Sequence, residues 1–166
     1  SEDKLLKLWE GLGYYNRVRN MQKAAQKIEE EYAGKFPENY EEIKALPGIG
    51  NYTAGAISSF AYGIPKPAVD GNVLRVVSRL LASDEDIMKA SVRTKIENAI
   101  EPVIPEDAAS DFNQGLIELG AIVCVPNGEA KCEICPLTGI CEAKRLGIQN
   151  ELPVKKKAKA RRIEER

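Results

Sequence analysis

Four cysteines stand close together near the end of the chain and are the residues best suited to bind a metal. They are Cys124, Cys132, Cys135 and Cys141, the only cysteines in the sequence, and the gaps between them hold seven, two and five residues. Disulfide bonds are one interpretation, although they are rare in cytoplasmic proteins with a good apolar core. A structural zinc ion is another, but such sites usually have two short cysteine pairs and this segment has one. A single Cys-x2-Cys pair flanked by the longer gaps of seven and five residues favours a 4Fe-4S cluster, because four thiolates spaced in this way can surround a group wider than one ion.

An aspartate between apolar neighbours, Asp70, is the residue best suited to stabilise a developing positive charge. It lies in the run Ala68-Val69-Asp70-Gly71-Asn72-Val73, where the pattern predicts the start of a helix. The simplest role is a helix cap, because aspartate accepts N–H bonds from the first turn. A carboxylate held there also stays ionised and can face the oxocarbenium-like sugar of glycosidic cleavage. The chain has no histidine, which excludes histidine metal sites and Ser-His or Cys-His catalysis.

A glycine-rich turn, Leu46-Pro47-Gly48-Ile49-Gly50, precedes another predicted helix. Its glycines permit a tight turn with outward-facing amides at a helix N-terminus, where the dipole favours an anion such as a DNA phosphate. Such a contact positions a protein on DNA without reading its bases. An ordinary helix-turn-helix corner with Leu46 and Ile49 in the core explains the same pattern equally well.

Apolar residues recur at helical spacing nearly throughout, and no long stretch alternates with period two, so we expect an all-α fold. Helices are expected over residues 5–12, 17–32, 40–46, 52–62, 71–81, 91–100 and 108–123. Pro65 and Pro67 predict a joint between two helical lobes. We therefore expect lobes at 1–64 and 65–146, followed by a basic linker or tail at 147–166.

The net charge is −1, but residues 151–166 hold seven Lys or Arg against three Glu, which leaves the preceding residues near −5. Binding to DNA would therefore depend on local basic patches and backbone amides.

No apolar run approaches the ~20 residues of a membrane span, and the polar start lacks the apolar core of a signal peptide. We expect a protein of the bacterial cytoplasm, acting at the nucleoid.

The hairpin, the Val69-Asp70-Gly71-Asn72 run and the cysteine loop, in this order and spacing, resemble the helix-hairpin-helix glycosylases that carry iron-sulphur clusters. The runs 9–20 (WEGLGYYNRVRN) and 52–57 (YTAGAI) resemble those of MutY-type adenine glycosylases. The resemblance implies a two-lobed fold with a helical-barrel lobe and a cluster lobe. It also implies a monomeric enzyme that removes adenine mispaired with 8-oxoguanine or guanine from double-stranded DNA.

The resemblance also implies roles for single residues. Asp70 would stabilise the oxocarbenium ion or briefly bond to the anomeric carbon, Asn72 would orient Asp70, and Tyr52 would line the sugar pocket. Endonuclease III-type enzymes have a Schiff-base lysine at position 52, so the tyrosine predicts hydrolysis without strand cleavage. Implied DNA contacts are Leu46, Gly48, Gly50, Leu12, Tyr14, Arg17, Arg19 and Gln114.

Within this set Tyr14 would wedge into the duplex and help to unstack the target base. One tyrosine of the pair Tyr14 and Tyr15 is expected to pack in the core instead. Gln114 stands where the family pattern has an acidic residue near the adenine pocket.

Three departures from the family pattern carry consequences. The family's proton-donating glutamate lies before the first helix of this chain, and a general acid contributes ~10²- to 10⁴-fold, so we expect little or no excision by this chain alone. The 8-oxoguanine-recognition domain would follow the basic tail. The first cysteine gap is one residue longer than the usual six.

Three other functions are alternatives to an adenine glycosylase. They are an endonuclease III-like enzyme for oxidised pyrimidines, a non-catalytic DNA-binding iron-sulphur module, and a ferredoxin-type electron carrier.

Overall fold

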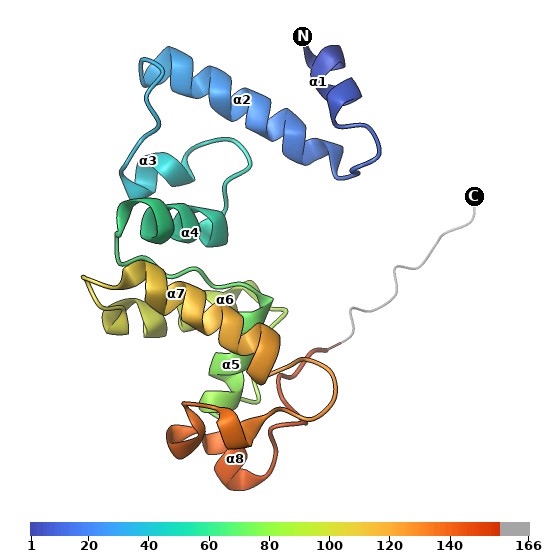
Figure 1. The fold of residues 1–166 in the computed structure, drawn as a ribbon, viewed down its shortest axis with the longest axis vertical. Coiled ribbons are helices and arrows are strands. Elements are labelled where there is room, and N and C mark those ends of the chain that lie inside the picture. The colour runs from blue at the N-terminus through green and yellow to red at the C-terminus, as the bar shows by residue number, and fades with distance from the viewer. Residues whose placement is uncertain (157–166) are drawn as a thin grey trace. The chain divides into compact units, whose positions relative to one another are not determined.

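The computed structural model describes residues 1–156, and all regular structure in this range is helical (Figure 1), which confirms the all-α fold class. The α-helices are α1 (Glu2–Leu8), α2 (Tyr15–Glu31), α3 (Tyr40–Lys44), α4 (Asn51–Tyr62), α5 (Gly71–Leu80), α6 (Ala90–Ile100), α7 (Ala109–Glu118) and α8 (Glu142–Leu146). Short helical turns are η1 (Glu101–Val103), η2 (Leu119–Val123), η3 (Cys132–Ile134) and η4 (Thr138–Ile140). Among the described helices we find none suited to crossing a lipid bilayer.

Residues 1–68 and 104–113 form the first of two compact units. Within it α1 packs on α2, and α3 packs on α4. Gly55 of α4 lies so close to the following segment that a Cβ there would stand 2.0 Å from the carbonyl oxygen of Pro67. The buried Asn113 accepts a bond from the Ala68 amide at 2.9 Å and donates one to the Lys66 carbonyl at 3.0 Å. These contacts fix the segment that leaves α4.

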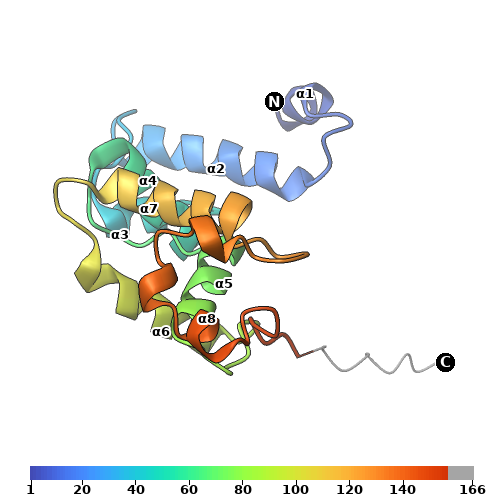
Figure 2. The same ribbon diagram turned by 60° about the horizontal axis from the view of Figure 1, so that its bottom comes forward.

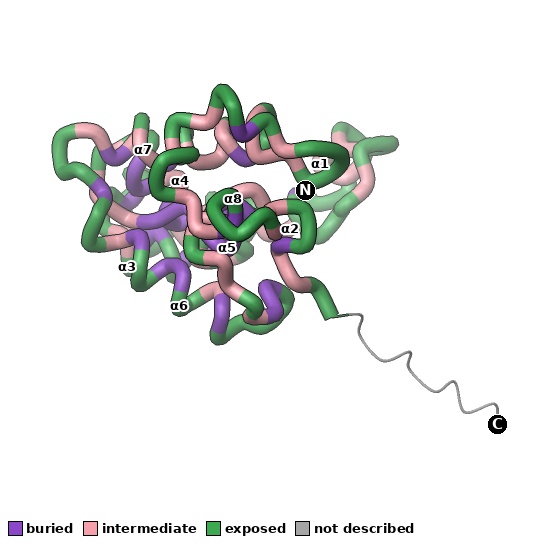
Figure 3. The backbone as a smooth tube through the Cα atoms, turned by 90° about the horizontal axis from the view of Figure 1, so that it is seen from below, coloured by how far each residue is buried: buried purple, intermediate pink, exposed green. Residues whose placement is uncertain are grey.

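Among the described residues, the second unit consists of 69–103 and 114–156. Its central element is α5, which is buried from Val73 to Arg79 and contacts α6, α8 and η2 (Figures 2 and 3). The boundary after Ala68 directly follows the predicted joint at Pro65 and Pro67. The first unit also includes residues 104–113, which the predicted lobes 1–64 and 65–146 assigned elsewhere.

The expected first helix over residues 5–12 is wrong at its end, because α1 stops at Leu8. Gly11 and Gly13 have positive φ angles of 84° and 66°, which end the helix before Leu12.

The expectation that Tyr14 or Tyr15 packs in the core is also wrong. Tyr14 is 87% exposed and Tyr15 is 40% exposed.

The expected helix over residues 108–123 changes character at its end. After Glu118 the chain forms the π-helical turn η2. Here Gly120 approaches α5 so closely that a Cβ would lie 2.6 Å from the Cβ of Asn72. The short helix α8 was not predicted, because the apolar spacing in the cysteine segment is too brief to reveal it.

The described part of the expected basic linker or tail at 147–166 is hydrogen-bonded to the second unit. The Leu152 carbonyl accepts a bond from Arg79 Nε at 2.9 Å, and the Val154 carbonyl accepts one from the Ile87 amide at 3.1 Å. The Lys156 amide donates to Asp86 Oδ1 at 3.3 Å. Most of the basic run, from residue 157, lies outside the described residues.

Candidate functional site

Asp70 caps the N-terminus of α5, which confirms the predicted helix cap. Its Oδ1 accepts the backbone N–H of Asn72 at 2.8 Å and that of Val73 at 2.9 Å. Its Oδ2 accepts the side-chain amide of Asn72, also at 2.8 Å. Three N–H donors thus hold both oxygens of a half-buried carboxylate at the N-terminus of α5.

A buried arginine extends these contacts. Arg75 is 5% exposed, and its Nη2 donates to Asn72 Oδ1 at 2.9 Å and to the Gly120 carbonyl at 2.6 Å. Its Nε donates to the Cys124 carbonyl at 2.8 Å. Sequence reasoning missed Arg75, although a lone charge within the apolar run 73–77 is a usable signal. Asp70, through Asn72 and Arg75, is thereby linked to the backbone of the first cysteine.

The electrostatic surroundings of Arg75 are mixed. Burial lowers the pKa of Arg75, and the neighbouring Arg79 acts in the same direction. Cys124 and Asp70 oppose this shift by favouring the charged guanidinium.

A second arginine, Arg93, bonds to the peptide group that joins Val69 to Asp70. Arg93 of α6 donates from Nη1 to the carbonyl of Val69 at 2.5 Å. Arg93 was not among the residues expected at the site, because its sequence context is that of an ordinary surface position on a helix.

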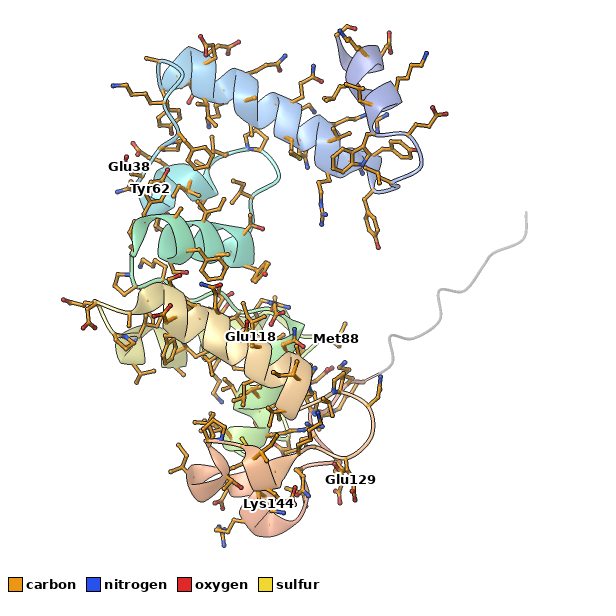
Figure 4. The ribbon with its side chains drawn as sticks, viewed as in Figure 1. Glu38, Tyr62, Met88, Glu118, Glu129 and Lys144 are labelled. Carbon is orange, nitrogen blue, oxygen red and sulfur yellow. The ribbon has the colours of Figure 1, made fainter. Side chains whose placement is uncertain are left out.

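The four cysteines line one cavity of about 30 Å³ in the second unit, together with Arg79 and Lys144. Figure 4 labels Lys144, which lies on α8. All four thiols are free, and Cys132 is buried. Arg79 Nη1 lies 3.3 Å from Cys124 Sγ, and Cys141 Sγ donates to the Arg79 carbonyl at 3.6 Å. Burial raises the pKa of the Cys132 thiol, and Lys144 opposes this shift.

The donor set of this cavity consists of four thiols. Within residues 1–156 no three ligating side chains gather closely enough for a single metal ion, yet four thiols surround a common space. Soft thiolate ligands arranged around such a space fit an iron-sulphur cluster.

The glycine-rich turn forms the predicted tight hairpin between α3 and α4. Gly48 has φ 79°, and a Cβ at this position would lie 2.6 Å from the Cβ of Asn20 on α2. Gly50 is the N-cap of α4 and has no side chain to accept the amides of the first turn. A helix N-terminus whose cap residue supplies no side-chain acceptor is the kind of site that can bind an anion.

Leu46 offers no exposed side chain for the expected DNA contact. Its side chain is only 2% exposed, its amide donates to the Ile43 carbonyl, and its carbonyl accepts from the Ile49 amide. Leu46 is a core residue that supports the turn, as the helix-turn-helix interpretation expected.

The other expected DNA contacts are at the surface. Leu12 is 64% exposed on the loop before α2, and Arg17 and Gln114 are exposed too. Arg19 differs from expectation because its Nε is 2.9 Å from Glu2 Oε1 on α1. Tyr52 stands in the first turn of α4, 40% exposed, and belongs to the first unit, whereas Asp70 belongs to the second.

Comparison with known proteins identifies the class to which this fold and hairpin belong. The chain belongs to the HhH-GPD superfamily of base excision DNA repair proteins, whose family model matches residues 1–102. It is 42% identical over 141 residues to the adenine DNA glycosylase of Buchnera aphidicola subsp. Acyrthosiphon pisum. That match covers 85% of this chain and 40% of the relative, so the chain spans about two fifths of the relative's length.

Solved structures agree on the fold. A thermostable thymine-DNA glycosylase has a TM-score of 0.76 at 27% identity, covering 88% of this chain and 67% of that one. An endonuclease III trapped as a covalent DNA intermediate has a TM-score of 0.72 at 30% identity, covering 89% and 68%. The resemblance inferred from the motifs is confirmed at the level of family and fold.

Proposed function

We propose that this chain is the core of an adenine DNA glycosylase that hydrolyses the N-glycosidic bond of adenine mispaired with 8-oxoguanine. The observation that carries the proposal is the carboxylate of Asp70, held at a helix N-terminus by three N–H donors. The similarity to relatives named adenine DNA glycosylase supports the choice of base.

In the proposed reaction the bond between the sugar and adenine breaks, and its electron pair leaves with adenine, which takes up a proton. The sugar becomes oxocarbenium-like, and Asp70 stabilises its positive charge until water adds to the anomeric carbon. Asn72 would act as a positioning residue, because its side-chain amide donates to Asp70 Oδ2. Tyr52 offers no amine for a Schiff base, so the strand stays intact.

Double-stranded DNA is the proposed partner, bound by a single copy of the chain in the cytoplasm. The backbone amides at the N-terminus of α4 would hold a phosphate, and Arg17 and Gln114 would add contacts. None of the residues discussed above is assigned to protonate adenine, and a general acid contributes ~10²- to 10⁴-fold, so we expect slow excision.

We propose that Cys124, Cys132, Cys135 and Cys141 hold a 4Fe-4S cluster. The cluster would cross-link the cysteine segment within the second unit. Their free thiols around one cavity support this assignment. A purified, anaerobically prepared chain should absorb broadly near ~400 nm and contain iron and sulphide. A colourless protein with one bound zinc ion would contradict it.

The proposed activity is tested by single-turnover assays with excess protein on two duplexes, one with adenine opposite 8-oxoguanine and one with an oxidised pyrimidine. We expect slow adenine release that Asp70→Asn abolishes, and no adduct after borohydride treatment. Release of the oxidised pyrimidine with a borohydride-trapped adduct would favour the endonuclease III-like alternative. Binding without release from either duplex would favour a non-catalytic DNA-binding module.

A further inference from the structure

The loop between α1 and α2 is closed by its own hydrogen bonds. The indole N–H of Trp9 donates to the Gly13 carbonyl at 2.8 Å, and the Leu12 amide donates back to the Trp9 carbonyl at 3.2 Å. The Arg17 amide then donates to the Tyr14 carbonyl at 2.8 Å, where α2 begins. The two bonds between Trp9 and residues 12–13 close the loop on itself.

This closure holds Tyr14 in an unusual backbone conformation. Tyr14 has φ 48° and ψ 44°, in the left-handed region, directly after Gly13 with φ 66°. A bulky residue rarely adopts this conformation, and it persists only where the surrounding structure imposes it. The bond from Trp9 ends on the carbonyl of the peptide that joins Gly13 to Tyr14, so it acts on the strained residue directly.

The same loop exposes apolar side chains that contribute nothing to the core. Tyr14 is 87% exposed and Leu12 is 64% exposed, whereas Trp9 is half-buried against Leu5 and Val18 in the groove between α1 and α2. A strained backbone that displays an aromatic ring to solvent indicates a binding surface. A flat ring on a rigid support suits stacking against a nucleic acid base.

We propose that Trp9 is a positioning residue for DNA distortion, whose indole N–H holds Tyr14 ready to enter the base stack. The proposal rests on the proposed function, since it takes double-stranded DNA as the partner. Pre-organisation matters because unstacking a base is costly, and a loop already in its bound conformation loses less entropy on insertion.

Trp9→Phe removes the N–H donor and keeps an aromatic ring in the groove. The readout is the fluorescence of 2-aminopurine placed opposite 8-oxoguanine, which rises when the base leaves the stack. At saturating protein we expect wild type to raise this fluorescence and Trp9→Phe to give a ~5-fold smaller unstacked population, as the loss of one hydrogen bond suggests. Binding to undamaged duplex, which depends on phosphate contacts, should be unchanged.

Leu5→Ala is the matched control, because Leu5 lines the same groove but makes no side-chain bond to the loop. If Leu5→Ala reduces the fluorescence as much as Trp9→Phe, general packing of α1 explains the effect and the proposal is wrong. An unchanged signal in Trp9→Phe would overturn it as well. A wild-type chain that binds no duplex would instead refute the proposed function.

A second variant guards against misfolding of Trp9→Phe. Trp9 is the only tryptophan in the chain, so its replacement by benzothienylalanine changes this position alone and substitutes sulphur for the N–H with little change of shape. This variant should reproduce the loss of 2-aminopurine fluorescence with unaltered circular dichroism. Full fluorescence in this variant would show that the N–H has no role.

Discussion

Asn72 binds both oxygens of Asp70, with its backbone N–H on Oδ1 and its side-chain Nδ2 on Oδ2, each over 2.8 Å. The backbone bond is an ordinary feature of a helix cap, but the side-chain bond depends on the residue type. A side chain that also accepts from Arg75 has its amide orientation fixed, with the nitrogen directed to Asp70.

Asn72→Ala should lower the rate of adenine release while leaving the helix cap in place. A hydrogen bond to a charged group contributes about 1.5–3 kcal/mol, so we expect a loss of ~10- to 150-fold in the single-turnover rate. The exposed Asn98 on α6 provides a matched control, and Asn98→Ala should retain the wild-type rate. A full rate in Asn72→Ala would exclude a positioning role for this side chain.

Arg75→Met should destabilise the second unit and loosen the cysteine segment. The change leaves the carbonyls of Gly120 and Cys124 without their donor, at about 1–3 kcal/mol for each buried group. Urea unfolding should show the loss, and iron content after purification should fall. Arg145→Met removes an exposed arginine that pairs with Glu142, and neither quantity should change. Equal effects of the two variants would contradict this account.

Two glycine substitutions should act in opposite directions. Gly55→Ala places a Cβ 2.0 Å from the Pro67 carbonyl oxygen, and overpacking of this kind costs about 1–3 kcal/mol or more. Gly115→Ala places its Cβ in open space within α7 and should raise stability by about 0.5–1 kcal/mol. The free energy of unfolding in urea distinguishes them, and a neutral Gly55→Ala would show that the segment after α4 can move away.

Glu2→Gln should increase affinity for DNA. Glu2 lies 2.9 Å from Arg19 and neutralises a cation expected to contact phosphate. Its removal frees Arg19, and one added phosphate contact steepens the dependence of log affinity on log salt by about 0.9. Glu30→Gln on α2 makes the same change of net charge at an exposed site without this contact. Identical salt slopes for the two variants would place Arg19 away from the DNA.

The local features of the site were predictable, because neighbouring residues determine them. The Asp70 cap and the tight turn at Gly48 depend on short-range backbone geometry, and both are present as expected. Helices with a clear apolar period, such as α2 and α5, were also located to within two residues.

Features set by contacts between distant segments were not predictable. The burial of Arg75 depends on carbonyls 45 and 49 residues further along the chain. The π-helical turn depends on the approach of Gly120 to Asn72, and no local pattern records that distance. Leu46 was assigned to DNA from the family motif, whereas its side chain fills the interior of the hairpin.

Arg79 has a consequence for how this chain can be shortened. Its Nε bonds to the Leu152 carbonyl, and its Nη1 bonds to the Val125 carbonyl and approaches Cys124 Sγ. A protein cut before Leu152 would leave a buried guanidinium N–H without its acceptor, beside the thiols. A shortened version made for expression should therefore retain the residues through Lys156, whose amide bonds to Asp86.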